Sequence, residues 1–383
     1  MAPNNPIQIM TSRPTQADVE LVKHDLKVSG YRPIELIVDQ YREECLNTPD
    51  EDDKYTETVR EFIAAVIPYA WRIESICLRL RTVAPIDELV MIPAEQLQQV
   101  EKATFDLTWR QEVTQGIWRN FLQSPAIRSV KFYSGSPATF PHIPSLSRLH
   151  ELEFASSKPI SEVLCCLQNA PNLHTLRTYW ISEDDGDLAK SGVLVELPHL
   201  QILNVRAVKP WLLTNRLGHL SSLRSLEILQ DLPSDSGLVL QSVCDLLERS
   251  TGCQLESLHL IFQNLKDDDV ICTIMDHALS ACSNLTELIL EVSFSHGYMT
   301  EAIVAKLTAT GNEAIFPKLR VLSLGYCKLE DGYIYEMITS RQSSQSPLEL
   351  LTLQLDKSCS ERYRAELGRV LTDTGLNVVP SFI

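Results

Sequence analysis

Apolar residues recur along most of this chain in one frame, which is clearest between positions 319 and 329. There the sequence follows L-x-x-L-x-L-x-x-C-x-L: Leu322 and Leu324 alternate as in a strand, and Cys327 and Leu329 follow as in an inward turn. The first part of this frame, with other apolar residues in place of some leucines, begins at Ile73, Val100, Ile127, Leu149, Leu173, Leu200, Leu223, Leu255, Leu285, Leu319 and Leu348. Successive starts lie between 22 residues (127 to 149) and 34 residues (285 to 319) apart.

A frame repeated at this spacing is typical of leucine-rich repeats, in which each unit is a strand, a turn and a return segment. The sequence therefore predicts an α/β solenoid of the horseshoe type, with a parallel sheet on the concave side and helical or irregular segments on the convex side. Prolines in the early returns favour irregular segments there, because proline breaks helix interiors. In the late units, the apolar residues of 240–247 and 271–282 follow helical spacing.

The chain divides into three parts by pattern. Residues 1–16 hold three prolines and no periodicity, and we expect a disordered tail. Residues 17–72 are expected to form an N-terminal cap and a degenerate first repeat, with a helix near the start, a strand over 34–38 and an acidic loop at 49–53. Residues 73–383 form the predicted repeat array with its C-terminal cap, which closes on an edge strand over 376–379.

Charge and cysteine usage narrow the functional classes. The formal net charge of −16 argues against a nucleic-acid-binding face and is compatible with basic protein partners or simply with solvated acidic loops. Ten cysteines are scattered without C-x-x-C spacing, which favours small buried thiols in a reducing compartment and no metal site. The start of the chain lacks a signal-peptide pattern, and no apolar run is long enough to span a bilayer. We expect a monomeric cytoplasmic or nuclear protein.

The search for catalytic or cofactor motifs finds none. Phosphate-binding glycine loops, H-E-x-x-H and G-x-S-x-G are all absent. His259 stands at a concave strand position, but Ser257 and Ile261, its neighbours along the strand, provide no carboxylate to orient it. Trp109, Trp180 and Trp211 are more typical of packing than of a cofactor site. The sequence therefore predicts no enzyme activity and no cofactor.

Side chains that alternate with the frame leucines should point into the concave hollow. They are Arg79, Lys131, Tyr133, Glu151, Glu153, Arg177, Tyr179, Arg206, Glu227, His259, Glu287 and Glu291. Tyr and Arg are enriched at the energetic centres of protein interfaces. We therefore predict a protein-binding patch at Tyr133, Arg177, Tyr179 and Arg206. Ordinary solvated strand residues are the alternative interpretation.

Three stretches resemble the leucine-rich part of fungal, mushroom-type F-box proteins: LKVSGYRPIELIV (26–38), FIAAVIPYAWRIESICLRL (62–80) and SPAIRSV (124–130). The resemblance implies repeats that recruit a target to a Skp–cullin–F-box ubiquitin ligase. The leucine-proline-x-glutamate-isoleucine opening of an F-box is absent here, so the resemblance does not carry adaptor binding over to this chain.

Two other classes of horseshoe remain open. An acidic horseshoe similar to ribonuclease inhibitor would bind a basic protein by charge. A GTPase-activating horseshoe would need a catalytic loop arginine, which the sequence alone does not identify.

Overall fold

The computed structural model of the chain describes most of the sequence. The described residues are 5–12, 14–39, 49–80, 87–107, 111–133, 146–183, 192–231, 236–262, 282–292, 301–308, 315–327, 332–343, 346–355, 365, 367–369 and 376–382. The chain folds as two compact units: unit 1 is Met1–Ser157 with Cys165–Leu173, and unit 2 is Lys158–Leu164 with His174–Ile383. The division passes through helix α5 (Ile160–Gln168).

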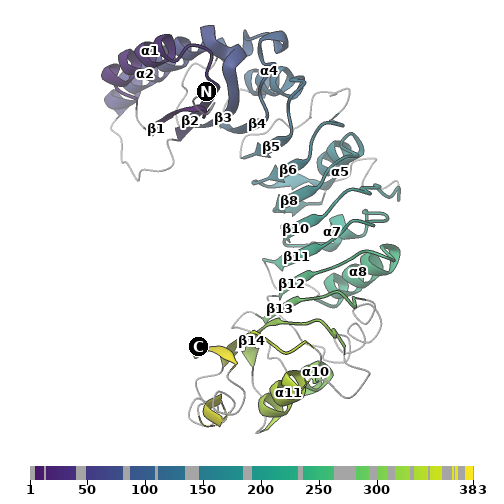
Figure 1. The fold of residues 1–383 in the computed structure, drawn as a ribbon. Coiled ribbons are helices and arrows are strands. Elements are labelled where there is room, and N and C mark those ends of the chain that lie inside the picture. Colours follow the sequence, from purple (N-terminus) through teal and green to yellow (C-terminus); the bar gives the residue numbers. More distant parts are fainter. Residues whose placement is uncertain are drawn as a thin grey trace. The chain divides into compact units, whose positions relative to one another are not determined.

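Unit 1 is built on a parallel sheet whose strand order follows the sequence. Its strands are β1 (Ile7–Thr11), β2 (Ile34–Asp39), β3 (Ile73–Leu80), β4 (Lys102–Leu107), β5 (Ser129–Phe132) and β6 (Glu151–Phe154). Its helical segments are α1 (Gln16–Val28), α2 (Pro49–Val66), η2 (Ile67–Arg72), α3 (Asp87–Val90), η3 (Ala94–Gln96) and α4 (Gln111–Leu122). Figure 1 shows α1 and α2 side by side at the start of this unit.

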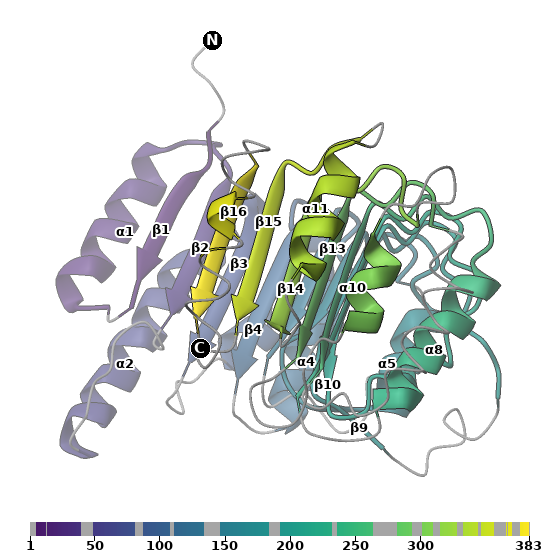
Figure 2. The same ribbon diagram turned by 90° about the horizontal axis from the view of Figure 1, so that it is seen from below.

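Unit 2 repeats the same plan. Its strands are β8 (Thr175–Tyr179), β10 (Ile202–Ala207), β11 (Ser225–Gln230), β12 (Ser257–Phe262), β13 (Glu287–Val292), β14 (Val321–Cys327), β15 (Leu350–Leu355) and β16 (Asn377–Phe382). Its helices are α7 (Trp211–Thr214), α8 (Ser236–Arg249), α10 (Glu301–Leu307) and α11 (Tyr333–Gln342). A short pair, β7 (Lys158–Pro159) and β9 (Ile181–Ser182), forms a separate two-stranded sheet. Figure 2 shows the parallel arrowheads of β14, β15 and β16.

The repeat frame is confirmed strand by strand. All eleven frame starts are at most 4% exposed. The strand begins two residues after the frame start in every repeat except the first, where β3 begins at Ile73 itself. In unit 2 the leucines are also in register: Leu226 on β11 pairs with Leu203 on β10 and Leu258 on β12, and all three are fully buried. Each buried leucine contributes about 2 kcal/mol of hydrophobic free energy, so a continuous row stabilises neighbouring repeats together.

Aromatic rings replace part of this leucine row in unit 1. Phe105 on β4 packs edge-on against Trp118 and Phe121 of α4, with ring centroids 4.6 and 5.0 Å apart. Phe132 and Phe154 continue the row on β5 and β6 and stack at 5.6 Å. Rings of this size fill the space between sheet and helix that smaller side chains would leave empty.

The structure differs from the sequence expectation at two places before residue 73, one in the predicted tail and one within the predicted cap. Residues 7–11, placed in a disordered tail, form β1 and pair with β2 from Ile7↔Ile34 to Thr11↔Val38. The acidic segment 49–53, expected as a loop, is the first part of α2. Proline suits the first turn of a helix and acidic residues suit its positive end, so this composition fits a helix start as well as a loop.

The remaining elements match in part. The expected strand over 34–38 is β2, the expected helix over 240–247 lies within α8, and the expected closing strand is β16, which pairs with β15. Of the predicted helix over 271–282, all but the last residue lie outside the described residues.

Candidate protein-binding face

The main-sheet strands β8 to β15 of unit 2 have an open face, formed by the side chains that alternate with the buried apolar residues. On β8 to β15 and at Asp231, which follows β11, the open face consists of Thr175, Arg177, Tyr179, Ile202, Asn204, Arg206, Ser225, Glu227, Leu229, Asp231, Ser257, His259, Ile261, Glu287, Ile289, Glu291, Val321, Ser323, Leu350, Thr352 and Gln354. Most of these are partly exposed, as expected for a face that none of the described helices covers. Figure 1 shows α7 and α8 together on the other side of the strands.

Three of the four predicted binding residues lie together on β8 and β10. Tyr179 is the cross-strand partner of Arg206, and Arg177 is the partner of Asn204. Cross-strand partners have Cβ atoms about 5 Å apart, so Arg177, Tyr179 and Arg206 form one contiguous surface. Among the described residues, neither Arg177 nor Tyr179 has a hydrogen-bond or ion-pair partner.

Arg206 is held in place from two sides. Its Nε donates to both carboxylate oxygens of Asp231, at 2.9 and 3.2 Å. Its Cζ lies 5.8 Å from the centre of the Trp180 ring. Trp180 itself is 43% exposed and has a left-handed backbone with φ of 63°. Trp180 thus packs against Arg206 while much of its side chain stays exposed, and its ring widens the aromatic and cationic surface beside Tyr179. Trp109 lies outside the described residues.

Tyr133, the fourth predicted residue, belongs to unit 1 and sits among charges there. The guanidinium of Arg79 lies 4.6 Å from the ring centroid and the Lys131 ammonium 5.0 Å from it. Arg79 also pairs with Asp39 at 3.0 Å, and Lys131 pairs with Glu153. Hydrogen bonds to Glu153 and Tyr133 raise the pKa of Lys131 against the opposing effect of burial, which is the largest single influence. Tyr133 is thus fixed within an internal charge network.

His259 has a carboxylate beside it, contrary to the sequence expectation. Glu287 comes from β13, and its Oε2 lies 3.2 Å from His259 Nε2. Ser257 Oγ donates to the same Glu287 oxygen at 2.8 Å and lies 3.1 Å from the same His259 nitrogen. A Ser-His-Asp relay needs the carboxylate and the hydroxyl on opposite ring nitrogens. Here both contact one nitrogen, so the cluster satisfies polar groups and does not activate the serine.

Apolar residues form a diagonal stripe across the open face of β11 to β15. The stripe consists of Leu229, Ile261, Ile289, Val321 and Leu350, all partly exposed. Leu229 pairs directly with Ile261, and Val321 pairs directly with Leu350. Ile289 links the two pairs diagonally, since its own partners are His259 and Ser323. The stripe is therefore continuous from β11 to β15.

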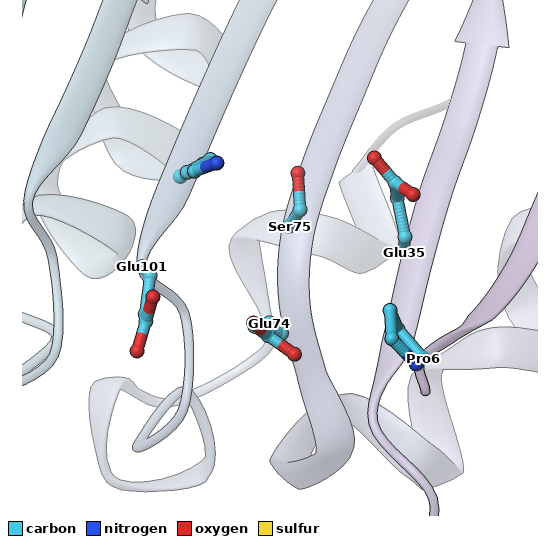
Figure 3. Close-up of a pocket in the computed structure, with 6 residues that line it drawn as sticks. Pro6, Glu35, Glu74, Ser75 and Glu101 are labelled. Atoms are coloured by element: carbon cyan, nitrogen blue, oxygen red, sulfur yellow. The ribbon is translucent and has the colours of Figure 1, made fainter. Parts of the chain in front are cut away.

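Unit 1 contains a small acidic hollow at the start of its strands. The hollow has a volume of about 180 Å³ and is lined by Pro6, Glu35, Glu74, Ser75, Glu101 and Lys102. Figure 3 shows Glu35 and Ser75 on adjacent strands at its rim. Gln8 Nε2 donates to Glu35 at 3.2 Å. In the part of the chain that the structure describes, no group of three or more His, Cys, Asp and Glu side chains is arranged to hold a metal ion.

The buried thiols of unit 2 are unreactive at neutral pH. Burial raises the pKa of Cys244, Cys282 and Cys327 to about 12. Since the thiolate is the reactive form, these side chains behave as small apolar groups at neutral pH. The prediction of buried thiols is confirmed for Cys166, Cys244, Cys282 and Cys327, whereas Cys77, Cys165 and Cys253 are partly exposed.

Comparisons with known proteins add no family assignment. No protein-family model matches the sequence, and a search of curated proteins finds no match. No helix within the described ranges combines the length and apolar character needed to cross a bilayer.

Sequence reasoning missed the partners that come from neighbouring strands. It identified Arg206 and His259 but not Asp231 or Glu287, which hold them. Placing the repeat frames in register would have set Glu287 opposite Ser257, because each strand starts at a fixed offset from its frame. The sequence pattern contains no comparable feature that predicts the exposure of Trp180.

Proposed function

We propose that this chain is a non-catalytic protein-binding scaffold, a leucine-rich-repeat horseshoe that holds a protein partner on its strand face. The observation that carries the proposal is the pair Arg177 and Tyr179, adjacent on the open face of β8 and without partners among the described residues. Arg206 and Trp180 extend the same surface. Rigid aromatic and guanidinium groups on a parallel-strand platform are the groups that dominate protein-interface energetics.

The resemblance to fungal F-box proteins supports a more specific role. In that family the repeats select a target for ubiquitin ligation, and the face described above would be the selecting surface. We place this activity in the cytoplasm or nucleus and expect the chain to act as a monomer without nucleic acid or cofactor. We do not expect this chain to bind the ligase adaptor by itself.

Purification of the tagged chain with mass spectrometry of bound proteins would identify the main partner, whose affinity is then measured with purified components. Replacing Arg177 and Tyr179 together with alanine should weaken binding at least tenfold, about 1.4 kcal/mol. Arg320→Ala with Tyr335→Ala is the matched control, because Arg320 is exposed and paired with Glu349 outside the patch and Tyr335 lies on α11. Unchanged affinity of the Arg177 and Tyr179 variant, with an intact fold, would contradict the proposal.

A second candidate function is favoured by the acidic later strands. Glu227, Glu287 and Glu291 lie on the open face of β11 and β13. An acidic horseshoe similar to ribonuclease inhibitor would use such residues to bind a basic protein. Identification of a strongly basic main partner would favour this candidate over ligase targeting.

A further inference from the structure

The diagonal stripe of unit 2 is bordered by carboxylates along both sides. Glu227 and Glu287 flank it on one side, and Asp231 and Glu291 on the other. Within the described strands β11 to β15, no Lys or Arg stands on the open face. The border therefore carries carboxylates beside β11 and β13 and, among the described strand residues, no Lys or Arg.

Most of this negative charge is not neutralised by neighbouring cations. Arg206 neutralises Asp231. Glu227, in contrast, accepts a 2.6 Å hydrogen bond from the neutral amide of Asn204. Glu291 has no hydrogen-bond or ion-pair partner among the described residues and lies beside Gly325, where an added Cβ would come within 2.9 Å of the Glu291 Cα atom. Gly325 is buried, and the Glu291 side chain passes over it through the space that a side chain on Gly325 would need.

From this arrangement we propose that the diagonal stripe seats an amphipathic helical segment of a protein partner, with Lys or Arg on both sides of its apolar stripe. The proposal rests on the proposed function, since it specifies what part of a partner the strand face contacts. Apolar contact with Ile261 and Ile289 would supply affinity, and the flanking carboxylates would select basic over acidic segments.

The size of the stripe fits a helix of this kind. Strands lie about 4.8 Å apart, so five strands span roughly 19 Å across the sheet. The stripe also shifts by four residues along the strands, about 13 Å, and its diagonal is therefore roughly 23 Å long. A helix rises 1.5 Å per residue, so about 15 residues, or four turns, would cover it.

The test uses a synthetic peptide of about 15 residues. Leucines at helical spacing form one face of this probe, and lysines form the rest. Fluorescence anisotropy with the purified chain measures its affinity against two comparison peptides, one with Glu in place of Lys and one with the same residues in an order that has no apolar face. We expect binding of the first peptide at least tenfold tighter than of either comparison peptide. We also expect Glu291→Lys to weaken it about tenfold, and Ile261→Ser with Ile289→Ser to weaken it further.

Glu248→Lys is the matched control because it makes the same charge change at an exposed position of α8, on the helix side. Equal losses from Glu291→Lys and Glu248→Lys would show attraction by net charge alone and would overturn the proposal. Failure of the wild-type chain to prefer the amphipathic Lys peptide would overturn it as well. Either result would leave the Arg177 and Tyr179 test of the proposed function standing, since that test measures a different surface.

Discussion

Arg341 and Leu307 are joined by a buried hydrogen bond of 2.7 Å, from the Nε of the arginine to the carbonyl of the leucine. The other guanidinium nitrogens of Arg341 donate to the carbonyls of Phe316 at 2.9 Å and Ile315 at 2.6 Å. One side chain at the end of α11 thus satisfies three backbone acceptors of the preceding repeat. Arg341 is 1% exposed, and burial lowers its pKa to about 10. It remains charged at neutral pH, where each of these bonds is charge-assisted.

Replacing Arg341 with methionine should therefore destabilise unit 2. The variant leaves three carbonyls without their donor, and we expect a loss of about 3 kcal/mol in the free energy of unfolding. Arg320→Met is the control, because among the described residues the Arg320 side chain pairs only with Glu349, at an exposed position, and its loss should change stability by about 0.5 kcal/mol or less. Urea unfolding followed by circular dichroism measures both. A similar stability of the two variants would show that the Arg341 bonds contribute little.

The leucine row makes a second prediction about stability. Leu322 is fully buried in β14, and Leu322→Ala should cost about 2–5 kcal/mol, as for other buried leucines. Val321→Ala, at the adjacent open-face position, should cost about 1 kcal/mol or less. Because neighbouring repeats share the row, hydrogen exchange should increase in β13 and β15 as well as in β14. A loss below about 1 kcal/mol for Leu322→Ala would mean that its side chain is not part of the core.

Alkaline pH should weaken the fold through its buried thiols. Burial raises the pKa of Cys327 from an ordinary value of 9.0 to about 12. Between these values the unfolded chain has lost the proton while the folded chain retains it, so stability falls as pH rises above 9. From pH 8 to pH 10, wild type should lose about 1.4 kcal/mol more than Cys327→Ala. Urea unfolding under reducing conditions at both pH values tests this, and parallel losses in the two proteins would refute it.

A titration with the ligase adaptor tests the role of the N-terminal residues of this chain. Adaptor binding in F-box proteins depends on an exposed hydrophobic helix surface. In this chain Val19, Val22 and Leu26 of α1 are at most 7% exposed and Ile9 is buried in β1, whereas Leu21 and Val28 of the same helix are exposed but lie two turns apart. We expect no binding at micromolar concentration. Micromolar binding that is lost on deletion of residues 1–30 would restore an adaptor-docking role.

The repeat architecture could be read from the sequence because its signal is local. Leucines two residues apart, followed by an inward turn, bury the same strand face wherever they occur, and the repetition leaves little choice of fold. The open-face positions followed from the same alternation. Arg177, Tyr179 and Arg206 were therefore placed correctly on one surface before any tertiary contact was known.

The tertiary structure alone decided what depends on partners distant in sequence. β1 exists because residues 7–11 pair with β2, although no periodicity marks them as a strand. Asp231 pairs with Arg206 from 25 residues away in sequence (231 − 206). Glu287 contacts His259 from 28 residues away (287 − 259). Arg341, which joins successive repeats, donates to carbonyls 25, 26 and 34 residues earlier in the sequence. A sequence pattern reports which face of its own strand a residue occupies, whereas hydrogen bonds and ion pairs are set by which other segment folds against that face.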